Sequence, residues 1–218
     1  RFNSVPLPVQ IPWGEADQFQ GVIDLIRQKL IVWDGASLGT TYYQSEIPPD
    51  MKESAGRQRD KMIETLAEHD DDLADKYLEG LEITEEDIVR AIRDAALKLR
   101  IVPVMCGSAL RNKGIQPVLD AVLDYLPSPE DVPPVRGVNP ITREEEVRTS
   151  DPKGSLAALV FKIMQDEGRK LSYLRIYSGK IKAGDDLYNV SKGRKEKVSR
   201  LLKMHANKRE RLEAAQAG

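Results

Sequence analysis

The chain has 218 residues and a formal net charge of -2, and 31% of its residues are charged. This length accommodates one or two domains, and no apolar run approaches the roughly 18 residues of a membrane-spanning helix. Cys106 is the single cysteine, which excludes an internal disulfide and fits a cytoplasmic protein.

Charge is distributed unevenly along the chain. Residues 60–90 carry twelve acidic residues against three basic ones. Residues 192–211 invert this balance, with nine basic residues against two acidic ones. Separate acidic and basic regions predict two surfaces for two different partners.

The first hundred residues predict strands followed by helices. A strand is expected over Val5–Ile11, followed by three short strands near residues 19–25, 29–33 and 40–47. A long helix then begins at Pro48-Pro49, a short helix covers residues 70–79, and a third begins at Thr84 with a capping-box pattern that ends at Asp87. The side chains expected to face the core are Met51, Ala55, Met62, Ile63, Leu66, Leu73, Tyr77, Leu78, Ile88, Ala91, Ile92, Ala95 and Leu99.

A strand, a loop of small residues and a helix follow at residues 101–127. The uninterrupted apolar run Ile101–Cys106 predicts a buried strand. Gly107-Ser108-Ala109 then lets a ligand approach the backbone closely. A helix is expected from near Pro117, and apolar residues recur along it at helical spacing before Pro127 ends it. Ligands bind at such loops in α/β proteins.

These elements predict the organisation of the whole chain. Residues 15–100 form an α+β insert between two neighbouring parallel strands of an α/β domain, which supplies residues 1–14 and 101–127. Prolines between 128 and 153 indicate a stiff linker. From residue 154 to 218, four expected strands (156–164, 171–177, 186–190 and 195–204) indicate the first part of an antiparallel β-barrel.

Several short patterns favour structural interpretations. There is no Gly-x-x-x-x-Gly-Lys-Ser/Thr phosphate loop. Asp151-Pro-Lys-Gly154 is best explained as a turn, and Asn112-Lys-Gly114 lacks the aspartate that reads a guanine. His69, beside three aspartates, favours a solvated helix end over a divalent-cation site. Cys106 favours an inert core thiol over a reactive one.

The basic stretch allows two interpretations. Its cations alternate with apolar residues, so one strand can present them on a single face, either as a solvated surface or as a contact for RNA phosphates. The candidate RNA-facing residues are Lys192, Arg194, Lys195, Lys197, Arg200 and Lys203.

A series of motifs in order resembles the bacterial elongation factor G family of translational GTPases. The series runs nearly end to end and includes Gln20-Gly-Val-Ile-Asp24, Leu38-Gly-Thr40, Glu46-Ile-Pro48, Lys76-Tyr-Leu-Glu-Gly80, Gly107-Ser-Ala-Leu110, Asn112-Lys-Gly114, Asp124-Tyr-Leu-Pro-Ser-Pro129, Phe161-Lys-Ile-Met164, Tyr177-Ser-Gly179, Lys192-Gly-Arg-Lys195 and Met204-His-Ala-Asn207.

This resemblance implies a fold and a function. The α/β part is the end of a P-loop GTPase domain, and Gly107, Ser108, Ala109 and Leu110 form its guanine-contacting loop. The insert is associated with the acidic stalk protein of the large ribosomal subunit. The strands after residue 154 form part of domain II, which faces the RNA of the small subunit. The parent is expected to be a cytoplasmic ribosomal translocase that uses GTP and Mg²⁺.

The resemblance also implies what the chain does alone. Because the phosphate loop, both switches and the Asn-Lys-x-Asp motif would precede Arg1, we expect no catalytic residues, no GTP hydrolysis and no stable binding of GTP or GDP. No DNA, membrane or metal partner is expected. Truncated sheet edges favour self-association, which light scattering would detect.

Two alternatives to a translocase remain open. The loop Gln165–Leu171 departs from the family pattern, so a paralogue in ribosome recycling or ribosomal protection is one alternative. A free-standing ribosome- or RNA-binding module without nucleotide chemistry is the other.

Overall fold

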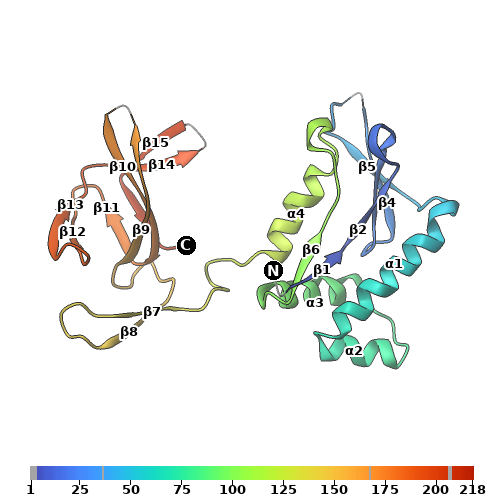
Figure 1. Cartoon of the computed structure of the whole chain (residues 1–218), viewed down its shortest axis with the longest axis horizontal. Helices are drawn as coiled ribbons and strands as arrows, with labels where there is room; N and C mark the ends of the chain where they lie inside the picture. The colour runs from blue at the N-terminus through green and yellow to red at the C-terminus, as the bar shows by residue number, and fades with distance from the viewer. Residues whose placement is uncertain (1–3, 36, 167, 206–207) are drawn as a thin grey trace. The chain divides into compact units, whose positions relative to one another are not determined.

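The computed structural model describes residues 4–35, 37–166, 168–205 and 208–218. The chain divides into two compact units, unit 1 (Arg1–Leu126) and unit 2 (Pro127–Gly218). Figure 1 labels the elements of both units. In the part of the chain that is described, no helix is long and apolar enough to cross a membrane.

A parallel strand pair closes unit 1. β1 (Val5–Pro8) pairs with β6 (Ile101–Val104), and Val5 lies opposite Ile101. The Ser4 hydroxyl donates to the carbonyl of Leu99 at 2.8 Å just before the pair begins. In Figure 1, the chain passes from β1 into β2, and the insert predicted over residues 15–100 returns through α3 to β6. The two strands expected to be parallel neighbours, near residues 5 and 101, are paired in parallel.

The single strand expected over Val5–Ile11 is wrong, because the chain changes partners at Val9. The N–H of Val9 donates to the carbonyl of Val104 at 3.0 Å, whereas its own carbonyl accepts from the N–H of Leu25 at 3.1 Å. The next strand therefore joins an antiparallel sheet in the order β2-β3-β4-β5. Its members are β2 (Gln10–Trp13), β3 (Gly21–Asp24), β4 (Lys29–Trp33) and β5 (Tyr42–Ser45).

Three helices complete the insert: α1 (Pro49–Ala67), α2 (Asp71–Leu78) and α3 (Glu85–Leu97). The Asp70 carboxylate accepts from the N–H of Leu73 at the start of α2. At the start of α3, the Thr84 hydroxyl accepts from the N–H of Asp87, and the Asp87 carboxylate accepts from the N–H of Thr84. The predicted capping box is confirmed, and it engages N–H groups that a helix end leaves without partners.

One apolar core joins the insert to the parallel strands. Ile23 of β3, Leu66 of α1 and Ile92 of α3 are fully buried, and Leu7 and Ile101 of the parallel pair belong to the same cluster. The expected inward faces of α1 and α3 are confirmed. Three residues assigned to the core are instead exposed, because Tyr77 and Leu78 lie at the end of the short α2 and Leu99 follows α3 in a left-handed conformation.

The side chains in the last part of unit 1 are less buried than predicted. A short 3-10 helix, η2 (Ala109–Arg111), precedes α4 (Ile115–Tyr125), which begins two residues before Pro117. β6 ends at Val104, and only its first residue is buried. The prediction of a buried strand over Ile101–Cys106 is wrong, because β1 is its one strand neighbour among the described residues. The large apolar side chains exposed in this part are Val102, Val104, Leu110, Ile115, Val118, Leu119, Val122, Leu123 and Leu126.

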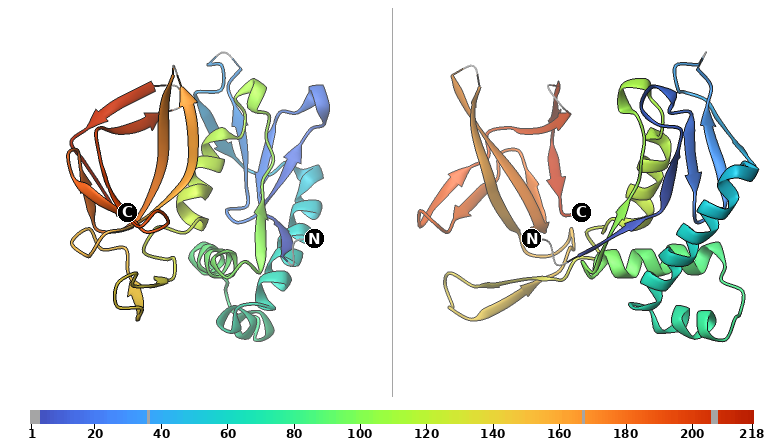
Figure 2. Two further views of the ribbon diagram at one scale, coloured as in Figure 1. Left: turned by 60° about the vertical axis from the view of Figure 1, so that its left-hand side comes forward. Right: turned by 45° about the vertical axis from the view of Figure 1, so that its right-hand side comes forward.

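Unit 2 consists of antiparallel strand pairs. In Figure 2, its longer strands curve around one another. The region expected to be a linker contains a hairpin, β7 (Val135–Val138) with β8 (Glu145–Arg148). The remaining strands are β9 (Ala157–Asp166), β10 (Arg169–Ser178), β11 (Lys180–Lys182), β12 (Asp186–Asn189), β13 (Arg194–Lys197), β14 (Leu201–His205), β15 (Lys208–Leu212) and β16 (Ala214–Gln216).

The fourth strand expected in unit 2, over residues 195–204, is wrong. β13 pairs with β12, whereas β14 pairs with β15. The break occurs at Val198, whose N–H donates to the carbonyl of Asp185 at 2.9 Å and whose carbonyl accepts from the N–H of Gly184 at 2.7 Å. The predicted number of strands after residue 154, four, is therefore too small. β11 and β16, which were not predicted, pair with each other.

Much of the apolar surface of unit 2 is exposed. Ile181 and Ala217 are buried, but Phe161 and Ile163 of β9 are 61% and 65% exposed. Leu159 and Val160, which are neighbours along β9 and therefore point to opposite faces of the strand, are exposed as well. Neither face of β9 is fully covered within the unit. The expected self-association stays a prediction, and these residues are its candidate contacts.

Asp87→Ala tests the link between the capping box and acid stability. A hydrogen bond from Lys76 and two from Thr84 lower the pKa of Asp87 from 3.8 to about 2. A lowered carboxyl pKa stabilises the fold above the unfolded-state pKa and loses this effect as the pH falls through the folded-state pKa. We expect the variant to lose about 1 kcal/mol at pH 7, and this difference to vanish between about pH 4 and pH 2.

Urea denaturation at a series of pH values measures this difference. The control is Glu86→Ala, which removes an exposed carboxylate from the same helix turn. A deficit of Asp87→Ala that stays constant down to pH 2 would contradict the assignment.

Candidate functional site

The loop of small residues after β6 is held in a closed turn. The N–H of Ser108 donates to the carbonyl of Lys113 at 2.8 Å, and the N–H of Lys113 donates back to the carbonyl of Ser108 at 3.0 Å. Asn112 completes the turn in a left-handed conformation with φ of 52°, which asparagine tolerates better than most residues. We call residues 107–114 the base-side loop, after the guanine contact that the motif resemblance predicts for residues 107–110.

Two glycines make this turn possible. A Cβ on Gly107 would lie 2.7 Å from the carbonyl oxygen of Lys113. A Cβ on Gly114 would lie 2.9 Å from Cα of Gly107, and the φ of Gly114 is +87°. Side chains are therefore excluded at both ends of the loop for steric reasons.

The tip of the base-side loop offers backbone donors to solvent. Ala109 and Leu110 are exposed, and Ser108 is half-buried. Ala109 and Leu110 form the first turn of η2, whose N–H groups precede the hydrogen bond from Asn112 to Ala109. Free N–H groups at a helix start are available to an acceptor on a ligand.

The residues that follow Ala109 contact the insert. Arg111, Asn112, Lys113 and Gln116 each donate a side-chain hydrogen bond to it. The motif pattern indicated residues 107–110 but not Gln116. No sequence signal identifies Gln116, because its two partners lie more than 70 positions earlier in the chain.

Cys106 lies between the strand and the loop rather than inside the strand. It is half-buried against the small cluster formed by Val22, Ile31 and Trp33. Burial raises the pKa of the Cys106 thiol, which keeps it protonated at neutral pH. The geometry supports the interpretation as an inert thiol.

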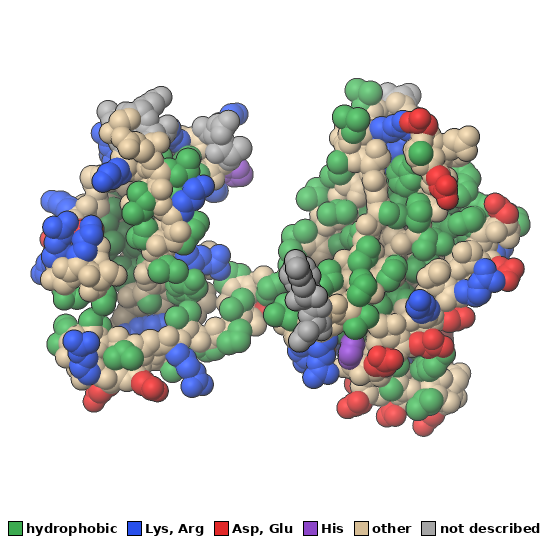
Figure 3. All heavy atoms as spheres, viewed as in Figure 1, with side chains coloured by type: hydrophobic (Ala, Val, Ile, Leu, Met, Phe, Trp, Pro, Cys, Tyr) green, Lys and Arg blue, Asp and Glu red, His purple; other side chains and the backbone are tan. Residues whose placement is uncertain are grey.

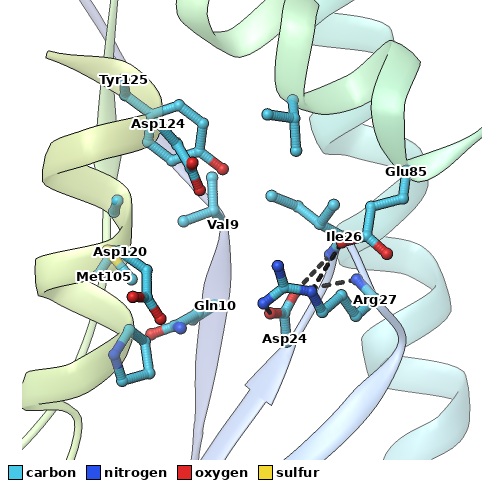
Figure 4. Close-up of a pocket in the computed structure, with 13 residues that line it drawn as sticks. Val9, Gln10, Asp24, Ile26, Arg27, Glu85, Met105, Asp120, Asp124 and Tyr125 are labelled. Carbon is cyan, nitrogen blue, oxygen red and sulfur yellow. Dashed lines mark hydrogen bonds and ion pairs between the residues drawn. The ribbon is translucent and has the colours of Figure 1, made fainter.

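A small polar cavity is lined by residues of β2, β3, α3 and α4 (Figure 4). The Asp24 carboxylate accepts from the N–H groups of Ile26 and Arg27 at 2.8 and 3.0 Å, and the Arg27 guanidinium donates to Glu85 at 2.7 Å. Burial raises the pKa of Asp24 against the effect of these hydrogen bonds. The cavity measures about 40 Å³, far below the roughly 300 Å³ of small ligand-binding pockets. It is too small for a nucleotide.

The turn predicted at Asp151 is confirmed, whereas the solvated setting expected for His69 is not. Asp151 and Gly154 form a turn in which the N–H of Gly154 donates to the Asp151 carbonyl at 3.1 Å. His69 is half-buried before the start of α2, and its Nε2 is buried without a hydrogen-bond partner among the described residues. Among the described residues, no group of three or more His, Cys, Asp or Glu side chains is placed to hold a metal ion.

The candidate RNA-facing cations are all exposed, but the structure divides them between two hairpins. Lys195 and Lys197 lie on β13 and Lys203 lies on β14. Lys192 and Arg194 converge on Glu196, with N–O distances of 3.2 and 3.3 Å. The expectation that one strand presents them all on one face is wrong. Figure 3 shows a dense group of cations where β12 and β13 lie.

Acidic side chains surround α2 and α3 in unit 1 (Figure 3). Several of them are paired with the few local cations: Arg90 contacts Asp70 at 2.9 Å, and Lys76 contacts Asp87 at 2.7 Å. The remaining carboxylates give this part of the insert a negative surface.

Comparison with known proteins agrees with these features. The chain is 66% identical over all 218 residues to a protein named "Elongation factor G 2" from Syntrophus aciditrophicus (strain SB), and it spans 32% of that relative's length. Over its whole length, this chain is similar to elongation factor G. The resemblance predicted from the motifs is confirmed. Because the chain spans about a third of this relative, the activity of a whole elongation factor G is not established by the match.

Two further matches support this similarity to elongation factor G. Residues 170–218 match the family model "Elongation factor Tu domain 2". A crystal structure of a protein from Thermus thermophilus superposes with a TM-score of 0.71 at 29% identity, and the match covers 98% of this chain and 29% of that one. These matches support the coarse fold prediction of a mixed α/β part followed by a domain of the β-barrel type.

Some residues of the elongation factor G motifs lie outside the described part. These are Ala206 and Asn207 of the motif that begins at Met204, and Glu167 of the divergent loop Gln165–Leu171.

Gly114→Ala tests the closed geometry of the base-side loop. The added methyl group meets Gly107 at 2.9 Å, and the φ of +87° is unfavourable for alanine. We expect the free energy of unfolding to fall by about 1–3 kcal/mol, measured by urea denaturation.

Gly56→Ala is the matched control, because its added Cβ has no neighbour within 4 Å and lies in the middle of α1. It should stabilise the chain by up to about 1 kcal/mol. Equal effects of the two changes would contradict a tight turn at Gly114.

Proposed function

We propose that this chain is a segment of a ribosomal translocase, a cytoplasmic GTPase that drives tRNA and mRNA movement during translation elongation. The observation that carries the proposal is the 66% identity to an elongation factor G along the entire chain. A match of this extent includes the base-side loop, the insert and the start of the β-rich unit together, rather than one motif.

The proposed organisation follows the expected boundaries. Residues 1–14 and 101–127 belong to the GTPase domain, and residues 15–100 form its insert. Residues 128–153 connect to domain II, whose first part is residues 154–218. The parallel pairing of β1 with β6 supports this division, because it joins the two chain segments on either side of the insert into one sheet.

We assign guanine contact to Gly107, Ser108, Ala109 and Leu110. The exposed η2 start supplies N–H groups suited to an acceptor on the base, and the small side chains leave room beside it. The described residues fit the base end of GTP or GDP. By the resemblance to elongation factor G, the phosphates and Mg²⁺ are held by other parts of the longer protein. Hydrolysis is accordingly assigned to that longer protein.

Two surfaces are assigned to the ribosome. The insert is the candidate contact for the large-subunit stalk protein. Since that partner and residues 60–90 are both acidic, contact through the carboxylates would be repulsive. The exposed aromatic side chains of the edge strand β5, Tyr42 and Tyr43, offer a better surface, because aromatic residues are enriched at interfaces.

The cations of unit 2 are the candidate contact for small-subunit rRNA. The assigned residues are Lys192, Arg194, Lys195, Lys197, Arg200 and Lys203, all exposed. The two that converge on Glu196 carry less free charge than the lysines of β13. Lys195 and Lys197 are therefore expected to contribute most to phosphate binding.

Hydrolysis assays on two lengths of protein test the proposed activity. The full gene product should hydrolyse GTP with strong stimulation by ribosomes, and less with ribosomes stripped of their stalk proteins. The 218-residue chain should show no single-turnover hydrolysis of Mg·GTP above background. A full gene product inactive with ribosomes would exclude a translational GTPase. Splitting of 70S ribosomes without mRNA movement would favour the recycling paralogue.

Charge reversal on β13 tests the proposed rRNA contact. Lys195→Glu combined with Lys197→Glu should weaken ribosome binding of the full gene product by about tenfold or more, and reduce its salt dependence by about two phosphate contacts. The control is Lys52→Glu with Lys61→Glu, which changes the same charge on α1 of the insert. Pelleting with ribosomes at several salt concentrations measures the binding of both double variants. Equal weakening of binding in the two would contradict the proposed rRNA contact.

A further inference from the structure

Two side chains of the base-side loop hold the first insert loop. The Arg111 guanidinium donates to the backbone carbonyl of Asp17 at 3.1 Å and to its carboxylate at 2.7 Å. The Lys113 ammonium donates to the carbonyl of Phe19 at 3.1 Å. These bonds connect residues 94 positions apart.

Two more side chains hold a second insert loop, between β4 and β5. The amide of Asn112 donates to the carbonyl of Leu38 at 3.1 Å. The amide of Gln116, at the start of α4, donates to the carbonyl of Gly39 at 2.9 Å, while its oxygen accepts from the indole of Trp33 at 2.9 Å. Gln116 therefore uses both ends of its amide on the insert.

Gly39 fixes how closely the two loops approach. Its φ is +80°, and a Cβ there would lie 2.5 Å from the carbonyl oxygen and 2.7 Å from Cβ of Asn112. No larger residue fits without moving one loop away from the other. Asn112 is itself the left-handed residue that closes the base-side loop, so the contact lies at the turn that orients Ala109 and Leu110.

We propose that these contacts form a clamp through which the insert holds the base-side loop and sets the dissociation rate of the bound guanine nucleotide. This inference rests on the proposed function, because it requires the guanine to lie against that loop. Loop residues fixed at both ends lose less conformational freedom when a ligand binds, which favours affinity. Gln116, Asn112 and Gly39 act as positioning residues and not as contacts to the nucleotide.

The clamp also provides a route for regulation. The loop that Gln116 and Asn112 contact connects β4 to β5. β5 carries the exposed Tyr42 and Tyr43. A partner that binds β5 and displaces this loop changes nucleotide affinity, and by linkage the nucleotide changes the affinity for that partner by the same factor.

Dissociation of fluorescently labelled GDP from the full gene product tests the clamp. Gln116→Ala removes the bonds to Trp33 and Gly39, and Gly39→Ala forces the loops apart without altering an atom of the base-side loop. Each should raise the dissociation rate by about tenfold, the effect expected from losing one or two ordinary hydrogen bonds.

Two controls separate positioning from general stability. Gln44→Ala changes an exposed glutamine of β5, away from the clamp contacts given above. Ile63→Val weakens the core under α1 while leaving the clamp residues unchanged. Both should keep the wild-type dissociation rate, and Ile63→Val should do so although it lowers the melting temperature.

The outcomes distinguish this inference from the proposed function. A full gene product that binds no GDP overturns the proposed function and the clamp with it. GDP binding with wild-type dissociation in both Gln116→Ala and Gly39→Ala overturns the clamp alone. In the 218-residue chain, Gln116→Ala should speed hydrogen exchange at the N–H groups of Ser108 and Lys113, and unchanged exchange there would also overturn the clamp.

Discussion

The parallel pairing of β1 with β6 is the constraint on which unit 1 depends. It brings Val5 beside Ile101, and thereby returns the chain to its starting point after the whole insert. Bringing such distant residues together costs loop-closure entropy, which the shared apolar core offsets. Leu7 and Ile101, from the two strands, pack in the same cluster as Ile92 of α3.

Closing the insert also places the base-side loop. Because β6 ends at Val104 and the next turn reverses at Asn112, residues 111–116 meet the insert loops at Asp17 and Gly39. The insert is therefore connected to the rest of unit 1 by side-chain hydrogen bonds as well as by the chain itself. Its loops are hydrogen-bonded to the loop that we propose contacts the guanine, and these bonds connect that loop to the exposed strand β5.

Apolar side chains are exposed in both units. Leu119 and Leu123 on α4, like Phe161 and Ile163 on β9, are exposed within the described structure although their patterns are typical of packed elements. The chain spans 32% of the length of its elongation factor G relative. The spacing of apolar residues predicts that one face of an element is packed, but it does not identify what that face packs against.

The sequence alone determined the features that depend on near neighbours. It was sufficient for the capping box at Thr84, the buried faces of α1 and α3, and the resemblance to elongation factor G, because local spacing and ordered motifs carry them. Tertiary structure decided the change of partners at Val9, the division of the cations between two hairpins, and the contacts of Gln116. These depend on which distant backbone groups meet, and hydrogen bonds between residues 74 to 94 positions apart leave no periodic trace in the sequence.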